Sequence, residues 1–227
     1  MGKFVNVVVS QENLRFNLEK IKLYSKNKKI CVMVKANSYG HGIKEVVSAL
    51  KGRADFFGVI NLEEAFKVRC EDSFTPIICF APIEEHDFLF ASKMNVSLSI
   101  SSLQYFFNIL KFVNKTACKI KIHININTGM NRLGIKTVKQ FKEMQDECEN
   151  NKNIIVEGVY THFAAAECDA KFSERQIKTF NKFLFHLSKR FSGIIHVGGS
   201  AAMMLKYDNL IEDIDMFRVG INIYGYN

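Results

Sequence analysis

Short apolar runs alternate with amphipathic segments along most of the chain, which is the pattern of strands alternating with helices. A first helix is expected from Ser10 to about Tyr24. The apolar runs predict strands at about 30–34, 56–60, 76–80, 96–100, 119–126, 154–161, 193–197 and 216–223. The amphipathic segments predict helices at 42–51, 61–70, 84–92, 101–113, 136–149 and 173–191, with a short helix near 200–206. The chain is therefore expected to form a regular β/α repeat.

Polar residues stand at the expected starts of several helices. Ser10 precedes the first helix, and Asn61 precedes a helix with an acidic first turn. Ser101 or Ser102 stands before a later helix, and Ser173 stands before the last long one. Side chains of Ser and Asn accept hydrogen bonds from the free N–H groups of a first turn, so these residues are predicted N-caps.

Eight strands alternating with helices predict a parallel α/β barrel, a (β/α)8 or TIM barrel, in one domain over residues 1–227. The chain of 227 residues is close to the roughly 250 that such a barrel needs. An open doubly wound sheet is the alternative, but no glycine-rich nucleotide loop follows any strand. The valine-rich segment 4–9 predicts an extra N-terminal strand with no place inside the barrel, which needs a covering surface from outside the chain.

Charge and composition narrow the range of functions. The net charge of +8 is spread along the chain without basic blocks, which favours solvated helix faces and argues against nucleic acid as a partner. No apolar run is long enough to span a bilayer, and no leader pattern is present, so no membrane partner is expected. The cysteines form no C-x-x-C pair, which predicts reduced thiols and a cytoplasmic location. They are Cys31, Cys70, Cys79, Cys118, Cys148 and Cys168.

Lys35 is the first candidate for chemistry. It stands at the end of the buried strand 30–34 and precedes the glycine-bracketed turn 40–42. In an α/β barrel the C-terminal ends of the strands form the mouth where active sites lie, so Lys35 is predicted to face that mouth. A solvated lysine in an ordinary loop is the alternative that spacing alone leaves open.

Two further strand ends carry a cation or a histidine. Arg132 follows the fifth predicted strand in a glycine-containing loop, and it either enters the barrel mouth or pairs with a surface carboxylate. His162 ends the sixth strand, where a structural histidine is the common alternative to a functional one. Glu167 and Asp169 follow His162, but their spacing matches no zinc pattern, so no metal is predicted.

The last two strands are followed by segments suited to bind phosphate. Gly199 and Ser200 open a short helix after the seventh strand, and Gly220 and Ile221 follow the eighth. Barrels often bind phosphate at these two places, because free backbone N–H groups and a helix dipole favour an anion. An ordinary glycine-rich turn remains the alternative.

Taken together, these segments resemble the alanine racemase family. The resemblance is carried by the nonapeptide at 34–42, by Thr-Gly-Met-x-Arg at 128–132, by Thr-His-Phe-Ala at 161–164, by the Gly-Ser-Ala segment at 199–201 and by Arg-x-Gly-Ile at 218–221. They occur in the family's order, each at a predicted strand end. The resemblance covers essentially the whole chain as the family's N-terminal barrel, a fold type III enzyme domain that binds pyridoxal 5′-phosphate.

The resemblance implies roles for individual residues. Lys35 would form a Schiff base with the cofactor and act as the base on one face of the substrate. The implied catalytic residues are Lys35, Arg132 and His162. The implied cofactor-binding residues are Lys35, Tyr39, His162, His196, Gly199, Ser200, Arg218, Gly220 and Ile221. Among these, Arg218 would donate to the pyridine nitrogen, and His196 would steady Arg218.

Three positions depart from the family's pattern. Asn127 stands in place of an aspartate, Gly199 in place of an asparagine, and Asn125 in place of a lysine that many members carry in carbamylated form. The neutral amide of Asn125 cannot supply the carbamate's negative charge to Arg132. Either a bound anion such as chloride replaces it, or Arg132 is held less firmly.

The function implied is that of an alanine racemase, an isomerase that converts L-alanine to D-alanine for the peptidoglycan precursors of the cell wall. In that family a β-rich second domain follows the barrel, pairs with the N-terminal strand and supplies a catalytic tyrosine across a homodimer. No residue of this chain matches that tyrosine, so we expect the cofactor-binding half of the enzyme, weakly active alone. Two alternatives remain: a racemase of serine or another small amino acid, and a non-catalytic cofactor-binding protein.

Overall fold

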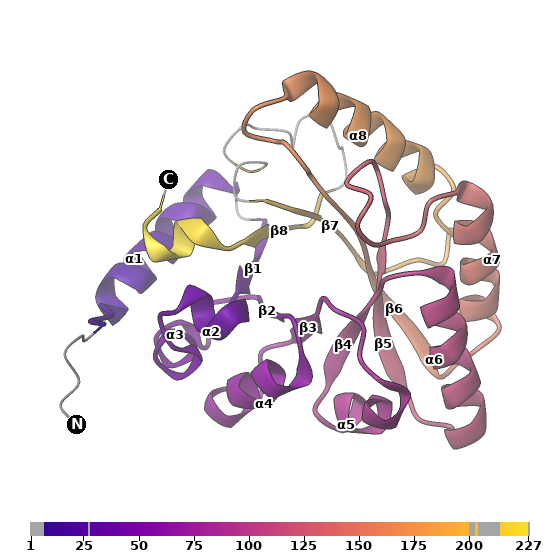
Figure 1. Ribbon diagram of the computed structural model, residues 1–227, viewed down its shortest axis with the longest axis horizontal. Helices are drawn as coiled ribbons and strands as arrows, with labels where there is room; N and C mark the ends of the chain where they lie inside the picture. The colour runs from indigo at the N-terminus through magenta and orange to yellow at the C-terminus, as the bar shows by residue number, and fades with distance from the viewer. Residues whose placement is uncertain (1–6, 27, 200–202, 204–213, 227) are drawn as a thin grey trace.

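Eight parallel strands close into a barrel in chain order, which confirms the predicted (β/α)8 architecture. The computed structural model describes residues 7–26, 28–199, 203 and 214–226 (Figure 1). The barrel closes because β8 pairs in parallel with both β7 and β1. The strands are β1 (Lys29–Met33), β2 (Phe56–Val59), β3 (Ile77–Cys79), β4 (Val96–Ile100), β5 (Ile120–Asn125), β6 (Ile154–His162), β7 (Ile194–Gly198) and β8 (Met216–Val219).

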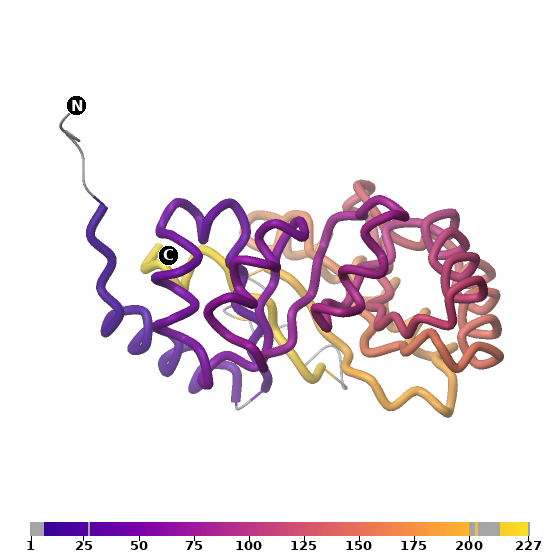
Figure 2. Tube along the Cα trace, turned by 90° about the horizontal axis from the view of Figure 1, so that it is seen from below, coloured from indigo at the N-terminus to yellow at the C-terminus, as the bar shows by residue number. Residues whose placement is uncertain are grey.

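Helices surround the barrel on its outer side (Figures 1 and 2). The first helix and the C-terminal η3 lie side by side at one end, where Asn17 Nδ2 donates to the carbonyl of Ile223 at 3.0 Å. The helices are α1 (Gln11–Tyr24), α2 (Lys35–Tyr39), α3 (Ile43–Leu50), α4 (Leu62–Glu71), η1 (Glu85–Asp87), α5 (Phe88–Lys93), α6 (Leu103–Thr116), α7 (Val138–Glu149), α8 (Ala170–Leu184) and η3 (Ile221–Tyr224). None of these described helices is long and apolar enough to cross a membrane.

Side-chain caps fix several helix starts. Ser10, Asn61 and Ser102 each accept a backbone N–H of the first turn, as their positions predict. The prediction that Ser173 caps the last long helix is wrong. The helix begins earlier, because Asp169 accepts the N–H of Phe172, and Ser173 is buried one turn further along with its hydroxyl on the carbonyl of Asp169.

Other boundaries also differ from the expectation. The eighth strand ends at Val219, because η3 begins at Ile221. The long helix expected to reach 191 ends at Leu184. In the extra N-terminal strand expected over 4–9, residues 7–9 form no strand, and residues 4–6 lie outside the described residues. The short helix expected near 200–206 also lies outside them, except for helical Met203.

The core has an outer layer and an inner layer, because side chains alternate across each strand. The main cluster joins one face of the strands to the helices, and it contains Val32, Phe57 and Phe106. A smaller cluster comes from the opposite face of the strands and fills part of the barrel interior. It consists of Cys31, Phe56, Ile78 and Met216. Polar residues share this interior, and they lead to the site described below.

The outer layer yields a stability prediction. Phe106 is completely buried, so Phe106→Ala leaves a cavity and is expected to lower the free energy of unfolding by about 3–5 kcal/mol. Phe74 is 90% exposed, so the matched change Phe74→Ala is expected to alter it by less than about 0.5 kcal/mol. Urea unfolding followed by circular dichroism measures both. Equal effects of the two changes would contradict this description of the core.

Candidate active site

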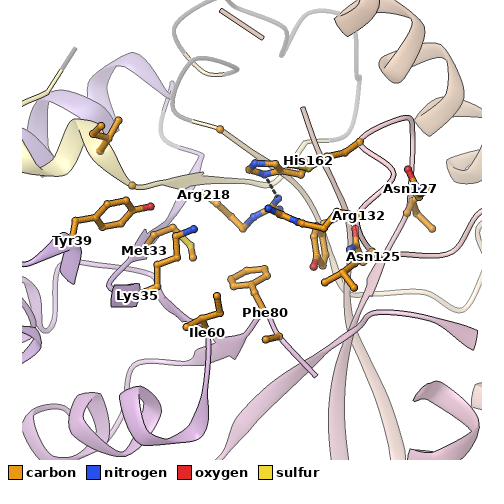
Figure 3. A pocket seen from close by; sticks show the side chains of 18 of the residues that line it. Met33, Lys35, Tyr39, Ile60, Phe80, Asn125, Asn127, Arg132, His162 and Arg218 are labelled. Carbon is orange, nitrogen blue, oxygen red and sulfur yellow. Dashed lines mark hydrogen bonds between the residues drawn. The ribbon is translucent and has the colours of Figure 1, made fainter. Parts of the chain in front are cut away.

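A cavity of about 380 Å³ opens at the C-terminal ends of the barrel strands, where Figure 3 shows side chains converging from both sides. This is the end of a barrel at which active sites lie. Predicted site residues line it together with apolar ones. The lining includes Met33, Lys35, Tyr39, Phe80, Asn125, Met130, Arg132, Tyr160, His162, Glu167, Gly199, Arg218, Gly220 and Ile221.

Lys35 is placed by an unusual turn that follows β1. The four residues after it, 36–39, have φ angles between 51° and 56°, in the left-handed region. Residues with a Cβ rarely adopt this conformation in succession, because the Cβ approaches the carbonyl oxygen. Backbone strain of this kind persists only where surrounding contacts enforce it, and it concentrates at functional sites. The turn brings Lys35 and Tyr39 to the same cavity.

Hydrogen bonds from α4 and α3 hold the left-handed turn. The buried carboxylate of Glu64 accepts the N–H of Asn37 at 3.3 Å and the N–H of Ile60 at 3.0 Å. The side-chain oxygen of Asn37 accepts the N–H of Ile43 at 3.1 Å. These bonds join the turn to the loop after β2 and to the start of α3. They supply the contacts that make the strained backbone the stable one.

Aromatic rings pack behind the turn. The ring of Tyr224 in η3 stacks on His41 at 4.5 Å between centroids and lies 5.3 Å from the ring of Tyr39. The hydroxyl of Tyr224 donates to the carbonyl of Met33 at 2.9 Å. This packing fixes Tyr39 against Gly220, where a Cβ would collide with the Tyr39 hydroxyl.

Arg218 supplies a buried cation beside Lys35. Its guanidinium donates to Nδ1 of His196 at 2.7 Å and to the carbonyl of Thr161 at 2.8 Å. It lies 4.3 Å from the ring centroid of Tyr160 and 5.3 Å from that of Phe80. Burial lowers the pKa of Arg218 to about 10. This is still well above 7, so Arg218 stays a cation at neutral pH.

His162 is a neutral histidine among cations. Its Nδ1 lies 3.4 Å from Nη2 of Arg218 and must accept, because a guanidinium only donates (Figure 3). Burial, together with the positive charges of Arg218, Arg132 and Lys35, lowers the pKa of His162 to about 3. The imidazole is therefore neutral throughout the physiological range, with its proton on Nε2.

Arg132 is exposed and lies at the rim of the cavity. Among the described residues it makes no hydrogen bond or ion pair, and Asn125 faces the same cavity with a neutral amide. Asn127 instead organises the loop, because its side-chain oxygen accepts the N–H groups of Gly129 at 3.0 Å and Asn131 at 3.1 Å. Asn127 is thus able to accept the bonds that an aspartate at this position would accept, whereas Asn125 leaves Arg132 uncompensated.

Glycines keep the cavity open. A Cβ on Gly198 would collide with the guanidinium of Arg218 and with the ring of His162. Gly199 has φ 110°, a backbone conformation that side chains rarely adopt, which accounts for glycine at this position. Chain backbone can therefore approach a bound molecule closely on this side of the cavity.

The structure brings most of the predicted site residues together. Eight of the cavity-lining residues, from strand ends β1, β5, β6, β7 and β8, were predicted. They are Lys35, Tyr39, Arg132, His162, Gly199, Arg218, Gly220 and Ile221. His196 is fully buried behind Arg218 and does not line the cavity. Ser200 lies outside the described residues.

Sequence reasoning missed the residues that support these side chains. The aromatic rings of Phe80 and Tyr160 flank Arg218, and Glu64 holds the left-handed turn. Within the described residues, no group of His, Cys, Asp and Glu side chains is arranged to hold a metal ion. Tyr160 was detectable in principle, because it shares its strand face with His162 two residues later.

Comparisons with known proteins give one consistent family. The sequence profile of "Alanine racemase, N-terminal domain" matches residues 9–227. The alanine racemase of Francisella philomiragia is 35% identical over 229 residues, and that of Lactococcus lactis subsp. lactis is 34% identical over 228. The matches cover 96% and 98% of this chain but 59% of each relative, so the chain spans about three fifths of their length.

Solved structures give the same picture. Alanine racemase of Clostridium difficile 630 superposes with a TM-score of 0.86 at 29% identity, covering 95% of this chain and 57% of that one. Histidine racemase of Leuconostoc mesenteroides subsp. sake superposes with a TM-score of 0.87 at 25% identity, covering 96% of this chain and 59% of that one.

The buried neutral state of His162 predicts a pH dependence. Below pH 6.5 the unfolded chain binds a proton at this histidine and the folded chain does not until about pH 3, so acid favours unfolding. From pH 7 to pH 5 this group is expected to remove about 2 kcal/mol of stability. Urea unfolding at both pH values measures the free energy of unfolding. Its decrease from pH 7 to pH 5 should be about 2 kcal/mol smaller in His162→Gln than in the unaltered chain, because glutamine still accepts from Arg218 but does not titrate. An identical fall in both proteins would refute the assignment.

Proposed function

The chain belongs to the alanine racemase N-terminal domain family, and we propose that its barrel mouth binds pyridoxal 5′-phosphate for the racemisation of a small amino acid, with alanine as the first candidate. The observation that carries the proposal is the placement of Lys35 in the same cavity as the buried cation Arg218. A lysine supplies the amine that this cofactor requires, and a fixed cation supplies the donor for its ring nitrogen.

The cavity fits the cofactor in size and charge. A volume of about 380 Å³ lies in the range of small-molecule sites. Among the described residues that line it, Lys35, Arg132 and Arg218 are cationic and one, Glu167, is a carboxylate. An excess of positive charge suits an anionic phosphate ester.

The residues divide into two groups by the part of the cofactor they would hold. The Tyr39 hydroxyl and the backbone at Gly220 and Ile221 form one side, where the first turn of η3 offers N–H groups to a phosphate. Arg218 would face the ring nitrogen, and His162 would lie near the ring. In this arrangement Lys35 stands between the phosphate side and Arg218 (Figure 3).

The cofactor, when bound, supplies an electron sink that acidifies the α-hydrogen of an attached amino acid. Lys35 would then hold and return a proton at Nζ on one face of the substrate. Arg218 remains a cation at neutral pH and donates only, so it does not accept or readily give up a proton at the ring nitrogen. Arg132 at the rim would orient the substrate carboxylate.

Racemisation by two bases needs a second base on the opposite face. The described tyrosines of the cavity are engaged elsewhere, because Tyr39 packs against Gly220 and the Tyr160 hydroxyl is hydrogen-bonded to Ser99 at 2.6 Å. The matched relatives extend beyond the part that this chain spans. We therefore place the second base in residues outside this chain, contributed by a second domain and a homodimer.

Lys35 is the direct test of cofactor binding. Lys35→Ala is expected to abolish the absorbance band of the lysine-bound cofactor and to weaken pyridoxal phosphate binding by at least about 100-fold, or roughly 2.7 kcal/mol, because the covalent link is lost. Lys44→Ala removes an exposed lysine of α3 and should leave both unchanged. Absorbance titration of the purified chain measures the effect. A band that persists in Lys35→Ala would overturn the assignment.

Gly220 tests the phosphate side. Its φ of −113° suits any residue, but an added Cβ would displace the Tyr39 hydroxyl. Gly220→Ala is expected to weaken pyridoxal phosphate binding about tenfold, or roughly 1.4 kcal/mol, while thermal unfolding of the cofactor-free chain changes little. Unchanged affinity would place the phosphate elsewhere in the cavity.

A further inference from the structure

A continuous series of buried hydrogen bonds leads from Arg218 into the barrel interior. Nη1 of Arg218 donates to Nδ1 of His196 at 2.7 Å. Nε2 of His196 lies 2.9 Å from Nδ1 of His123, and Nε2 of His123 lies 3.0 Å from Oε2 of Glu157. Both imidazoles are completely buried. The series therefore links a cation at the mouth to a carboxylate three hydrogen bonds away.

The two ends of the series force one direction on it. A guanidinium only donates, so Nδ1 of His196 must accept and its proton must stand on Nε2. That proton points to Nδ1 of His123, which accepts in turn, so the proton of His123 stands on Nε2 and goes to Glu157. An ionised carboxylate only accepts, which is what this last position requires. Each neutral imidazole thus accepts toward Arg218 and donates toward Glu157.

Charges around the series favour this protonation. Burial and the charge of Arg218 hold the pKa of His196 well below its usual value, and burial lowers the pKa of His123. Burial alone would raise the pKa of Glu157, but the hydrogen bonds from His123 and Ser97 and the nearby charge of Lys121 together lower it to about 2. Lys121 adds an ion pair to the other carboxylate oxygen at 3.2 Å.

The barrel wall is shaped for the series. Gly158 leaves room for the ring of His123, because a Cβ there would collide with Nδ1. Next to Gly158, the register between β5 and β6 shifts by one residue between Ile122 and His123. Such a bulge changes the face to which a side chain points. Gly158 and Tyr160 face the barrel interior, so strict alternation would point Glu157 outward. The bulge allows its carboxylate to reach His123.

We propose that His123 and Glu157 are positioning residues that act through His196 to hold Arg218 in place as a cation at the barrel mouth. The role of Arg218 toward the cofactor ring rests on the proposed function, whereas the hydrogen-bond series is independent of it. The carboxylate serves as a remote counterion to the buried guanidinium, and the polarised imidazoles carry its effect.

Other groups around Arg218 act differently. Burial raises the pKa values of Tyr160 and Cys31, so these two neighbours are neutral at pH 7, and the positive charge of Arg132 opposes the charged form of Arg218. Tyr160 also stacks on His196 at 4.8 Å between centroids, and Thr161 accepts from Nη2 through its carbonyl. His162 is neutral. Among the described residues, no carboxylate forms an ion pair with Arg218. Glu157 is therefore the anion that the hydrogen-bond series connects to it.

The protonation pattern is testable in the unaltered chain without cofactor. Long-range ¹H–¹⁵N NMR of the imidazoles should show His123 and His196 neutral with the proton on Nε2 from pH 6 to pH 8. Single His→Gln variants assign the signals. A proton on Nδ1 of either residue, or a doubly protonated ring at pH 7, would overturn the proposal even if cofactor binding is intact.

Glu157→Gln and Ser97→Ala form a matched pair. The first removes the negative charge of the carboxylate, whereas the second removes only the hydrogen bond that the Ser97 hydroxyl donates to its Oε2. Titration of the ¹³Cζ signal of Arg218 at alkaline pH should show a pKa lower by about 0.5–1 pH unit in Glu157→Gln and little changed in Ser97→Ala. Equal titrations in Glu157→Gln and the unaltered chain would refute the remote counterion.

A second pair tests transmission through His123. Glutamine in His123→Gln can accept from His196 through Oε1 and donate to Glu157 through Nε2, whereas His123→Leu can do neither. We expect the unaltered Arg218 titration in His123→Gln and the lowered one in His123→Leu. A merely structural role predicts no such rescue, so identical Arg218 titrations in the two variants would count against the proposal.

Discussion

The burial of one positive charge is the constraint on which the rest of the site depends. A guanidinium removed from water loses several kcal/mol of hydration unless its donors are bonded and its charge is balanced. Arg218 is 5% exposed. Its guanidinium donates to a histidine and to a backbone carbonyl, and it lies near two aromatic rings. The space for this arrangement requires glycine at position 198. The polar barrel interior is thus a consequence of the cation at its mouth.

The same cation determines the state of its neighbours. His162 accepts from Arg218 and stays neutral. Lys35 reaches the cavity from a left-handed turn that Glu64 ties to the loop after β2, because its carboxylate accepts the N–H groups of Asn37 and Ile60. Fixed donors and a strained but well-supported lysine turn are arranged before any ligand arrives. Such preorganisation is what electrostatic catalysis needs, because no free energy is then required to orient the groups during reaction. The barrel's rigid strands supply it.

The fold was largely predictable, because eight buried runs separated by amphipathic segments specify a closed parallel barrel. The predicted boundaries were wrong where a neighbouring residue or element determines the end. Asp169 caps the last long helix in place of Ser173, and the eighth strand ends early because η3 begins at Ile221. Strand ends also located Lys35 and His162, because a parallel barrel brings all such ends to one mouth, whereas Arg218 was expected only from the family resemblance. The support from Glu157 was not predictable, because it depends on a bulge that strict alternation does not reveal.

The most direct measurement is the site of covalent attachment. The chain is incubated with pyridoxal phosphate, reduced with borohydride and digested, and the modified peptides are mapped by mass spectrometry. The account predicts one dominant adduct, on the peptide that carries Lys35. Adducts spread over surface lysines, or none at Lys35, would contradict the claim that this barrel mouth is a pyridoxal phosphate site.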